Sequence, residues 1–229
     1  MLEPMMPGHC GRGMSLVELL VGMAVGLIVV AAGSSVVLDN VRENRALDLE
    51  MRLMQDLRTA ADIVSRDLRR AGYWAGSASG VRSDDGSRVA PNPYAAIAPD
   101  RAASDGARVR FSRDAIENGL VDGNEQFGFR LHNGALELQL GDGNWQALTD
   151  ATLLSITRFT IEPHTEESSL ARFCVDPCPA GSAVCPPRQH IKSFAIAVTG
   201  RSIADPRIRR SLFSSVRVRN VPVVGSCDA

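Results

Sequence analysis

The sequence predicts an α+β protein in which one long N-terminal helix packs on an antiparallel β-sheet. Three observations predict this fold class. An uncharged apolar run covers residues 19–38, a helical amphipathic pattern follows over residues 39–71, and short alternating segments separated by turn signals fill the remainder of the 229-residue chain. A helix that precedes a series of strands is the element order of an α+β arrangement.

Composition excludes a general nucleic-acid-binding domain. The chain carries 25 basic and 26 acidic side chains, and 45% of its residues are hydrophobic, which is typical of a folded protein. We therefore expect no nucleic-acid partner. Five arginines near the C-terminus form a local basic patch, which we interpret as an exposed sheet face, with DNA binding as the alternative: Arg207, Arg209, Arg210, Arg217 and Arg219.

The apolar run predicts a transmembrane helix. Its 20 residues, LLVGMAVGLIVVAAGSSVVL, match the roughly 20 residues that cross a bilayer as a helix. A cleaved secretory signal peptide is the alternative, but its apolar region has only about 7–15 residues. We expect the membrane half of the helix to cover residues 14–38, with Arg12 on the cytoplasmic side. Lipidation of Cys10 would need an apolar run before it, and MLEPMMPGH is not one.

A carboxylate at the leading edge of this run is expensive in a membrane and therefore usually functional. Glu18 lies within the string RGMSLVELL, which resembles the processing signal of type IV pilins and pseudopilins. The resemblance implies that residues 1–13 are a prepilin leader, that prepilin peptidase cuts after Gly13, and that Met14 is then methylated. Glu18 occupies the place of the family's acidic residue, whereas Met14 replaces the usual phenylalanine.

Subunit assembly is the role that the resemblance implies for Glu18, whose carboxylate would neutralise the N-terminal ammonium of a neighbouring subunit. Gly22 and Gly26 form a G-x-x-x-G pattern that would let the helix of that neighbour approach closely. A general bias toward small residues in membrane helices is the alternative for the two glycines.

Residues 39–71 continue the helix with one apolar face toward the head. No proline interrupts residues 14–71, Asp48–Arg52 and Asp62–Arg66 have the spacing of helix-stabilising ion pairs, and Gly72 offers a left-handed stop. The predicted buried face recurs at intervals of three and four residues and comprises Met51, Met54, Leu57, Ala61, Val64, Leu68 and Ala71.

A second resemblance appears where the helix ends. Residues 64–76 read VSRDLRRAGYWAG and resemble the segment (I/V)SRD(I/L)RxAGYxG that closes the long helix of PilW-type minor pilins. Residues 209–220, RRSLFSSVRVRN, resemble the C-terminal strand of the same proteins. We expect Tyr73 and Trp74 to pin the following loop to the head. The matching residues are Ser65, Arg66, Asp67, Arg69, Ala71, Gly72 and Tyr73.

The globular head is expected over residues 72–229. Loops are predicted at 75–106, with a short helix near 94–98, and at 163–189. Asn133-Gly134 is a hairpin-turn signal. The predicted strands cover residues 107–111, 127–131, 136–140, 152–161, 191–198 and 212–218.

Loss of the leader would remove Cys10 and leave an even number of cysteines: Cys174, Cys178, Cys185 and Cys227. In an oxidising compartment these predict up to two disulfides, and the three possible pairings stay open. A zinc site that includes His164 or His190 is the alternative. We expect no cofactor and no metal, and we interpret Asp84-Asp85-Gly86 and the Asp122–Glu125 segment as turns.

The chain has no catalytic motif such as GxSxG, HExxH or a Walker loop, so we expect no enzyme. The resemblance implies a minor pilin subunit that helps prime type IV pilus assembly and is incorporated near the pilus tip. Its implied partners are other minor pilins, the major pilin, prepilin peptidase, a large tip adhesin and the assembly platform. Its implied location is the inner membrane with a periplasmic head, and later the cell surface. The alternatives are a J-type minor pseudopilin of type II secretion and a single-pass membrane-anchored periplasmic enzyme or receptor.

Overall fold

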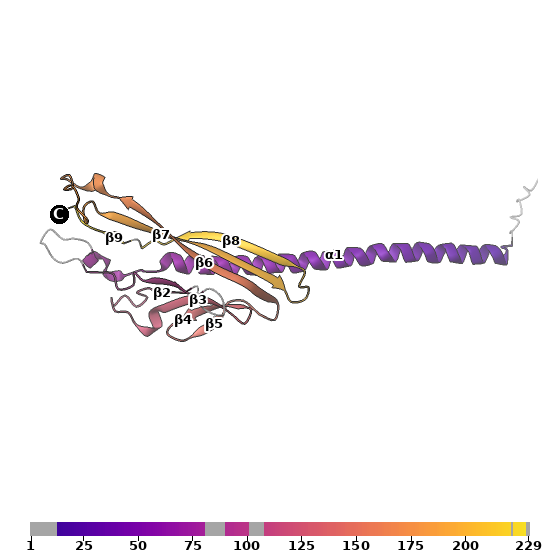
Figure 1. Ribbon diagram of the computed structural model, residues 1–229. Helices are drawn as coiled ribbons and strands as arrows, with labels where there is room; N and C mark the ends of the chain where they lie inside the picture. Colours follow the sequence, from indigo (N-terminus) through magenta and orange to yellow (C-terminus); the bar gives the residue numbers. More distant parts are fainter. Residues whose placement is uncertain (1–12, 81–89, 101–107, 221, 228–229) are drawn as a thin grey trace, which may run out of the picture. The chain divides into compact units, whose positions relative to one another are not determined.

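The computed structural model describes residues 13–80, 90–100, 108–220 and 222–227 (Figure 1). The leader, Cys10 and the Asp84-Asp85-Gly86 turn lie outside these residues. The chain divides into two units, residues 1–47 and 48–229, and each is described by itself.

One long helix, α1, runs from Leu16 to Arg70, so the predicted helix 14–71 is confirmed to within two residues at each end. Its residues up to Arg45 are exposed. Within the described part of the chain, α1 is one helix whose length and apolar composition suffice to cross a membrane.

The first sheet of the second unit is a five-stranded antiparallel meander in the order β1-β2-β3-β4-β5. The expected helix near residues 94–98 is wrong, because Ile97 to Asp100 form a strand that pairs with β2, with Ile97 opposite Phe111. The pairing partner decides this segment, which is too short to show a strand pattern of its own. The strands are β1 (Ile97–Asp100), β2 (Arg108–Ser112), β3 (Gln126–His132), β4 (Ala135–Leu140) and β5 (Trp145–Ala147).

A second, four-stranded sheet has the order β6-β7-β8, with β9 paired to β7. The head therefore contains two antiparallel sheets, where we expected one. Strands β6 and β7 extend as a hairpin through much of the predicted loop 163–189. The sequence hides this extension because residues 163–167 are exposed on both faces and do not alternate. The strands are β6 (Leu154–Ser169), β7 (Arg188–Ser202), β8 (Arg209–Arg217) and β9 (Val223–Val224).

Two predicted turn signals are confirmed by backbone angles. Asn133 and Gly134 both have positive φ, 50° and 76°, as a two-residue hairpin turn of type I′ requires. Gly72 has φ 73°, so α1 ends in the left-handed conformation that glycine adopts at lowest cost.

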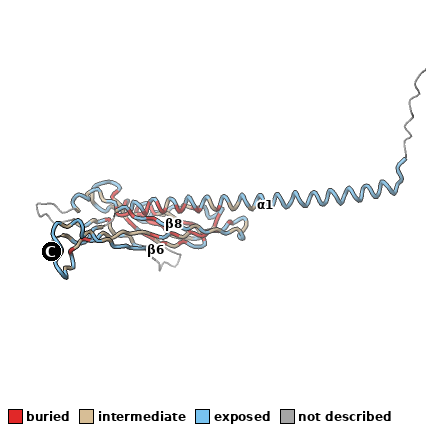
Figure 2. Tube along the Cα trace, turned by 90° about the horizontal axis from the view of Figure 1, so that it is seen from above, coloured by how far each residue is buried: buried red, intermediate tan, exposed pale blue. Residues whose placement is uncertain are grey.

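The core of the second unit is formed by side chains from α1 and from both sheets. Figure 2 marks the buried residues in red along the part of α1 that lies beside the strands. The predicted helix face is correct from Leu57 onward, but Met51 is 64% exposed and Leu53 is buried in its place. Gly200 of β7 explains this choice, because a Cβ on Gly200 would lie 3.4 Å from Leu53 Cδ1 and 3.2 Å from Leu57 Cδ2. The missing side chain makes room for two branched leucines. The buried α1 residues of this core are Leu53, Leu57, Ala60, Val64 and Leu68, followed by Ala71.

Candidate functional site

The predicted processing residues lie at the start of α1 in the first unit. A Cβ on Gly13 would meet no heavy atom within 4 Å, so a larger residue would fit there without a clash in this chain. Met14 is exposed, and Ser15 O accepts a hydrogen bond from Leu19 N at 3.1 Å. Glu18 lies in the first turn, where the helix dipole favours a carboxylate. Ser15 and Glu18 also have the S-x-x-E spacing of a capping box, which the sequence reading missed.

Gly22 and Gly26 lie one helical turn apart on α1 and are exposed. A Cβ on either would meet no heavy atom within 4 Å. Within the described residues of this unit, the small-residue track is therefore open to another helix.

Asp67, in the motif at the end of α1, joins the helix to β2. Its Oδ1 accepts from Arg113 Nη1 at 3.5 Å, and the two side chains are only 11% and 13% exposed. The Arg113 guanidinium also lies 4.0 Å from the centroid of the Phe127 ring. Burial lowers the pKa of Arg113, and the adjacent Asp67 carboxylate opposes part of that shift. Asp67 thus compensates a cation that is held against the sheet core.

The last carbonyls of the helix are satisfied by distant segments. Ala71 O accepts from Asn220 Nδ2 at 3.1 Å, and Arg69 O accepts from Arg219 N at 3.1 Å. Gly72 O accepts from Asn92 Nδ2 at 2.9 Å, and Gly72 N donates to Ser112 O at 2.9 Å. The motif therefore forms the junction at which the helix, β2 and the chain after β8 are held together.

Two motif arginines take no part in this junction. The side chains of Arg66 and Arg69 are exposed and line an open groove of about 600 Å³ together with Asp62. Among the described residues neither forms an ion pair, so the predicted Asp62–Arg66 pair is not formed. The predicted Asp48–Arg52 pair is confirmed at 3.0 Å.

Trp74 contacts the segment that follows the helix, as predicted, whereas Tyr73 bonds to the loop between β2 and β3. The Tyr73 hydroxyl donates to Glu117 Oε1 at 3.2 Å, and this hydrogen bond raises the pKa of Tyr73. The Trp74 indole covers the next turn so closely that a Cβ on Gly76 would lie 2.7 Å from its Nε1.

Two buried carboxylates organise the loop between β2 and β3, and the sequence reading missed both. Glu125 is 0% exposed and accepts hydrogen bonds from Ala115 N at 2.6 Å, Ile116 N at 2.9 Å and Asp122 N at 3.3 Å. It also accepts from the hydroxyl of buried Tyr94 at 2.8 Å. The sequence did contain a signal for Glu125, because Asp122 and Glu125 have the D-x-x-E spacing of a capping motif directly before an apolar strand.

Asp114 has the corresponding role on the other side of the loop and is 1% exposed. It accepts from the backbone N–H groups of Ala75, Asn118 and Gly119 at 3.1–3.2 Å. Burial alone would raise the pKa of Glu125, but the hydrogen bonds from Ile116, Tyr94 and neighbouring amides outweigh burial and lower it. The loop is therefore built around an anion that stays ionised.

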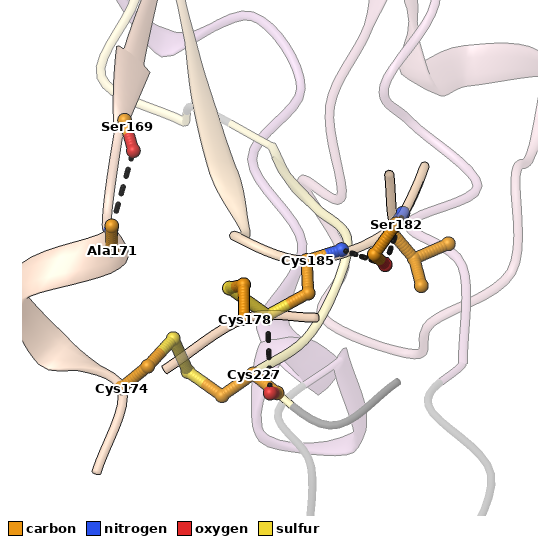
Figure 3. The surroundings of a disulfide bond; sticks show 8 residues. Ser169, Ala171, Cys174, Cys178, Ser182, Cys185 and Cys227 are labelled. Atoms are coloured by element: carbon orange, nitrogen blue, oxygen red, sulfur yellow. Dashed lines mark hydrogen bonds between the residues drawn. A yellow bond between two sulfur atoms is a disulfide. The ribbon is translucent and has the colours of Figure 1, made fainter. Parts of the chain in front are cut away.

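The four predicted cysteines come together as two disulfides, Cys174–Cys227 and Cys178–Cys185 (Figure 3). This is one of the three pairings that the sequence left open. The first joins the loop after β6 to the C-terminal segment, and the second closes a short turn within that loop. The sulfur atoms of Cys174, Cys178 and Cys185 lie within 4.8 Å of one another, but disulfide sulfurs carry no thiolate to bind zinc.

The arginines of the predicted basic patch and the two candidate histidines each make contacts of their own and do not form one site. Arg207 pairs with Asp205 at 2.7 Å, and Arg210 Nε donates to Glu50 of α1 at 2.8 Å. These ion pairs divide the basic patch that the sequence predicted near the C-terminus. Three exposed arginines of that patch have no paired acid among the described residues: Arg209, Arg217 and Arg219. His190 lies 3.7 Å from Glu167, across the β6–β7 hairpin. His164 is exposed on β6 and belongs to no described cluster of potential metal ligands.

Two family models match the chain. The model described as prepilin peptidase-dependent protein B matches residues 46–218, and the one described as prokaryotic N-terminal methylation motif matches residues 9–34. The second match includes Gly13, Met14 and Glu18. No curated protein and no solved structure matches the chain.

Proposed function

Because the chain belongs to the prepilin peptidase-dependent protein B family, we propose that it is a minor pilin of the PilW type. In this role it helps prime type IV pilus assembly and is incorporated near the pilus tip. Residues 1–13 are the leader, residues 14–38 anchor the subunit in the inner membrane, residues 39–71 carry the head, and residues 72–229 form that head in the periplasm. Family membership implies processing by prepilin peptidase and assembly with other pilins. It also supports the role of a structural subunit.

The observation that carries the proposal is the register of Gly13, Met14 and Glu18 at the start of an apolar helix. The methylation-motif match covers these residues, and the exposure of the helix up to Arg45 supports lipid or subunit contact along it. The junction made by Asp67, Ala71 and Gly72 supports a head that is fixed to the end of the same helix.

The mass of the mature chain tests the proposal. We expect the purified protein to begin at Met14, with one added methyl group. The variant Gly13→Val should stay unprocessed and absent from filaments. A Cβ at this position meets no heavy atom within 4 Å in the chain, so such a defect would not come from misfolding. Gly13→Ala is the matched control that adds the smallest side chain. Protein that still loses the leader in Gly13→Val would show that the cut lies elsewhere.

A J-type pseudopilin is the second candidate, because it shares the leader, the helix and part of the closing motif. Incorporation decides between them: a minor pilin is recovered in sheared pili, whereas a pseudopilin is needed for secretion through a secretin. A membrane-anchored periplasmic enzyme or receptor would instead keep residues 1–13 and would never leave the membrane.

A further inference from the structure

Strand β8 forms one edge of the second sheet and pairs only with β7 in the described part of the chain. Val218 N donates to Lys192 O and Ser202 N to Ile208 O, both at 3.0 Å. These bonds flank the β7–β8 ladder, in which Phe213 lies opposite Ala197. Because hydrogen-bonded pairs alternate in antiparallel sheets, the even-numbered residues of β8 bond to β7. The backbone N–H and C=O groups of the odd-numbered residues point to the free edge.

The side chains of the odd-numbered residues are also the exposed ones. Phe213 is 77% exposed, and Ser211 and Ser215 on either side of it are exposed as well. The even-numbered side chains face α1, since Arg210 bonds to Glu50 and Ser214 Oγ lies 3.5 Å from Ser65 Oγ. Unpaired backbone groups and a large exposed aromatic ring therefore coincide at the centre of β8.

Natural sheet edges are usually protected by proline, a bulge or a central charge. Residues 211–215, SLFSS, contain neither proline nor charge, and the register of the β7–β8 ladder is continuous. We propose that β8 is a docking edge, to which an extended segment of another protein adds as a further strand. Such a strand gains affinity from backbone hydrogen bonds and specificity from alternate side chains.

The charges at the two ends of the edge define the partner. Arg209 and Arg217 are exposed and form no ion pair among the described residues, whereas the nearby Arg207 and Arg210 are both paired. A strand with an apolar residue opposite Phe213 and an acidic residue four positions to each side would neutralise both arginines. The partner is thus an acid-flanked apolar strand.

A second copy of this chain matches the same edge less well. Two-fold symmetry makes the pairing of two β8 strands antiparallel. Centred on Phe213, that pairing places Arg209 opposite Arg217 of the copy, twice. Like charges directly opposite each other destabilise a strand pair, and Arg209 already lies opposite Arg201 of β7, so a copy would add a further arginine at that point. The edge therefore favours a different protein over a second copy. This conclusion rests on the sheet and not on the proposed function, under which the partner would be another subunit of the assembly.

The test uses the full-length chain in detergent and a blocked nine-residue peptide, Asp-Thr-Thr-Thr-Val-Thr-Thr-Thr-Asp. The control peptide has lysine in place of both aspartates. We expect the acidic peptide to bind at least tenfold more tightly by fluorescence anisotropy. We also expect hydrogen exchange to slow at least tenfold at the amides of Ser211, Phe213 and Ser215, which face the free edge.

Proline provides a matched pair of variants. The double variant Ser211→Pro with Ser215→Pro removes two N–H groups from the free edge and none from the β7 ladder. It also removes the contact of Ser211 Oγ with Thr199 Oγ1 at 2.9 Å, which an alanine control lacks as well. Binding should therefore fall at least tenfold relative to that control, while the two variants keep the same melting temperature. Replacement of the same two serines by alanine keeps the N–H groups and should bind normally. Arg209→Glu with Arg217→Glu should reverse the preference in favour of the lysine peptide. Should the proline variant fail to fold, hydrogen exchange on the unaltered chain decides.

Several outcomes would overturn the proposal. Equal binding of the two peptides would remove the role of the arginines, and absence of protection at the three edge amides would remove strand addition. Protection of β8 by single-stranded oligothymidylate in place of the acidic peptide would identify a nucleic-acid surface. A concentration-dependent dimer that the proline variant disrupts would identify a second copy as the occupant.

Discussion

Replacement of Glu125 by glutamine removes one charge from the interior of the loop between β2 and β3 and changes almost no volume. In the folded protein both carboxylate oxygens accept hydrogen bonds, from Ala115 and Ile116 at Oε1 and from Asp122 and Tyr94 at Oε2. The amide of glutamine can keep the first pair through its oxygen. Its NH2 group then faces the Asp122 N–H, donor against donor.

The expected loss of unfolding free energy follows from these four hydrogen bonds. A hydrogen bond to a charged group contributes about 1.5–3 kcal/mol and a neutral one about 0.5–1.5 kcal/mol, so each retained bond weakens by roughly 1 kcal/mol. Glutamine is cheaper to bury than a carboxylate, which offsets part of this loss. We expect Glu125→Gln to destabilise the second unit by about 2 kcal/mol, which for a unit of this size lowers the melting temperature by roughly 4–8 °C.

The pH dependence supplies the diagnostic sign. The folded-state pKa of Glu125 is lowered from its ordinary value of 4.5, so its stabilisation is complete above that value and is lost as the pH falls through the folded pKa. Glutamine cannot titrate. The difference in melting temperature between the original chain and the variant should therefore be largest near pH 7 and should shrink once the pH falls below 4.5.

Thermal unfolding of the full-length chain in detergent, followed by circular dichroism at neutral pH and near pH 3, measures this difference. Glu117→Gln is the matched control, because Glu117 lies in the same loop but is exposed, and its side chain bonds only to Tyr73 among the described residues. It should change the melting temperature by less than about 1 °C, as surface substitutions usually do. An unchanged melting temperature for Glu125→Gln, or a difference that stays constant with pH, would refute the reasoning.

Three further predictions concern the core, the disulfides and the N-terminus. Gly200→Val should lower the free energy of unfolding by about 1–3 kcal/mol, because it overpacks the contact between helix and sheet. Ala197→Val, on the outward face of β7, should lower it less. Thermal melts that rank the two variants in the reverse order would contradict this packing account. Removal of the Cys174–Cys227 disulfide, whose cysteines are 53 residues apart, should lower the free energy of unfolding by about 4 kcal/mol. Removal of the Cys178–Cys185 disulfide, whose cysteines are 7 residues apart, should lower it by about 2 kcal/mol. Denaturant titration measures both losses, and equal losses would exclude a chain-entropy origin. Glu18→Gln keeps the size of the side chain but removes its charge, so under the proposed function co-purification with partner pilins should weaken while cleavage continues. Unchanged recovery and normal piliation would eliminate the charge-pairing role.

The Glu18 experiment also bears on position in the filament. A subunit at the extreme tip has no subunit above it whose ammonium needs a carboxylate, and this chain retains its acid. Under the proposed function, we therefore expect this chain to lie beneath another minor pilin. A tip reconstruction that shows this head outermost would contradict that placement.

The candidate site was predictable where its parts are local in sequence. The register of Gly13 and Glu18, the apolar run and the helix stop at Gly72 each depend on residues a few positions apart. The motif at the end of α1 was recognised in the sequence, but the structural roles of its residues were not predicted. That Asp67 balances Arg113 depends on a residue 46 positions further along the chain, and the exposure of Arg66 and Arg69 depends on which face of α1 the sheets cover.

Local patterns in the sequence predicted a long helix followed by strands, the uncharged apolar run and the ends of the long helix to within two residues. Hydrophobic periodicity and turn chemistry act over a few residues, which is why these features were readable. Only the tertiary structure decided which of Met51 and Leu53 is buried, since a glycine in β7 makes the space. It also decided β1, the cysteine pairing and the burial of Glu125. Each of these depends on contacts that residue spacing alone does not specify, and the free edge of β8 exists only because the strands are arranged in one particular order.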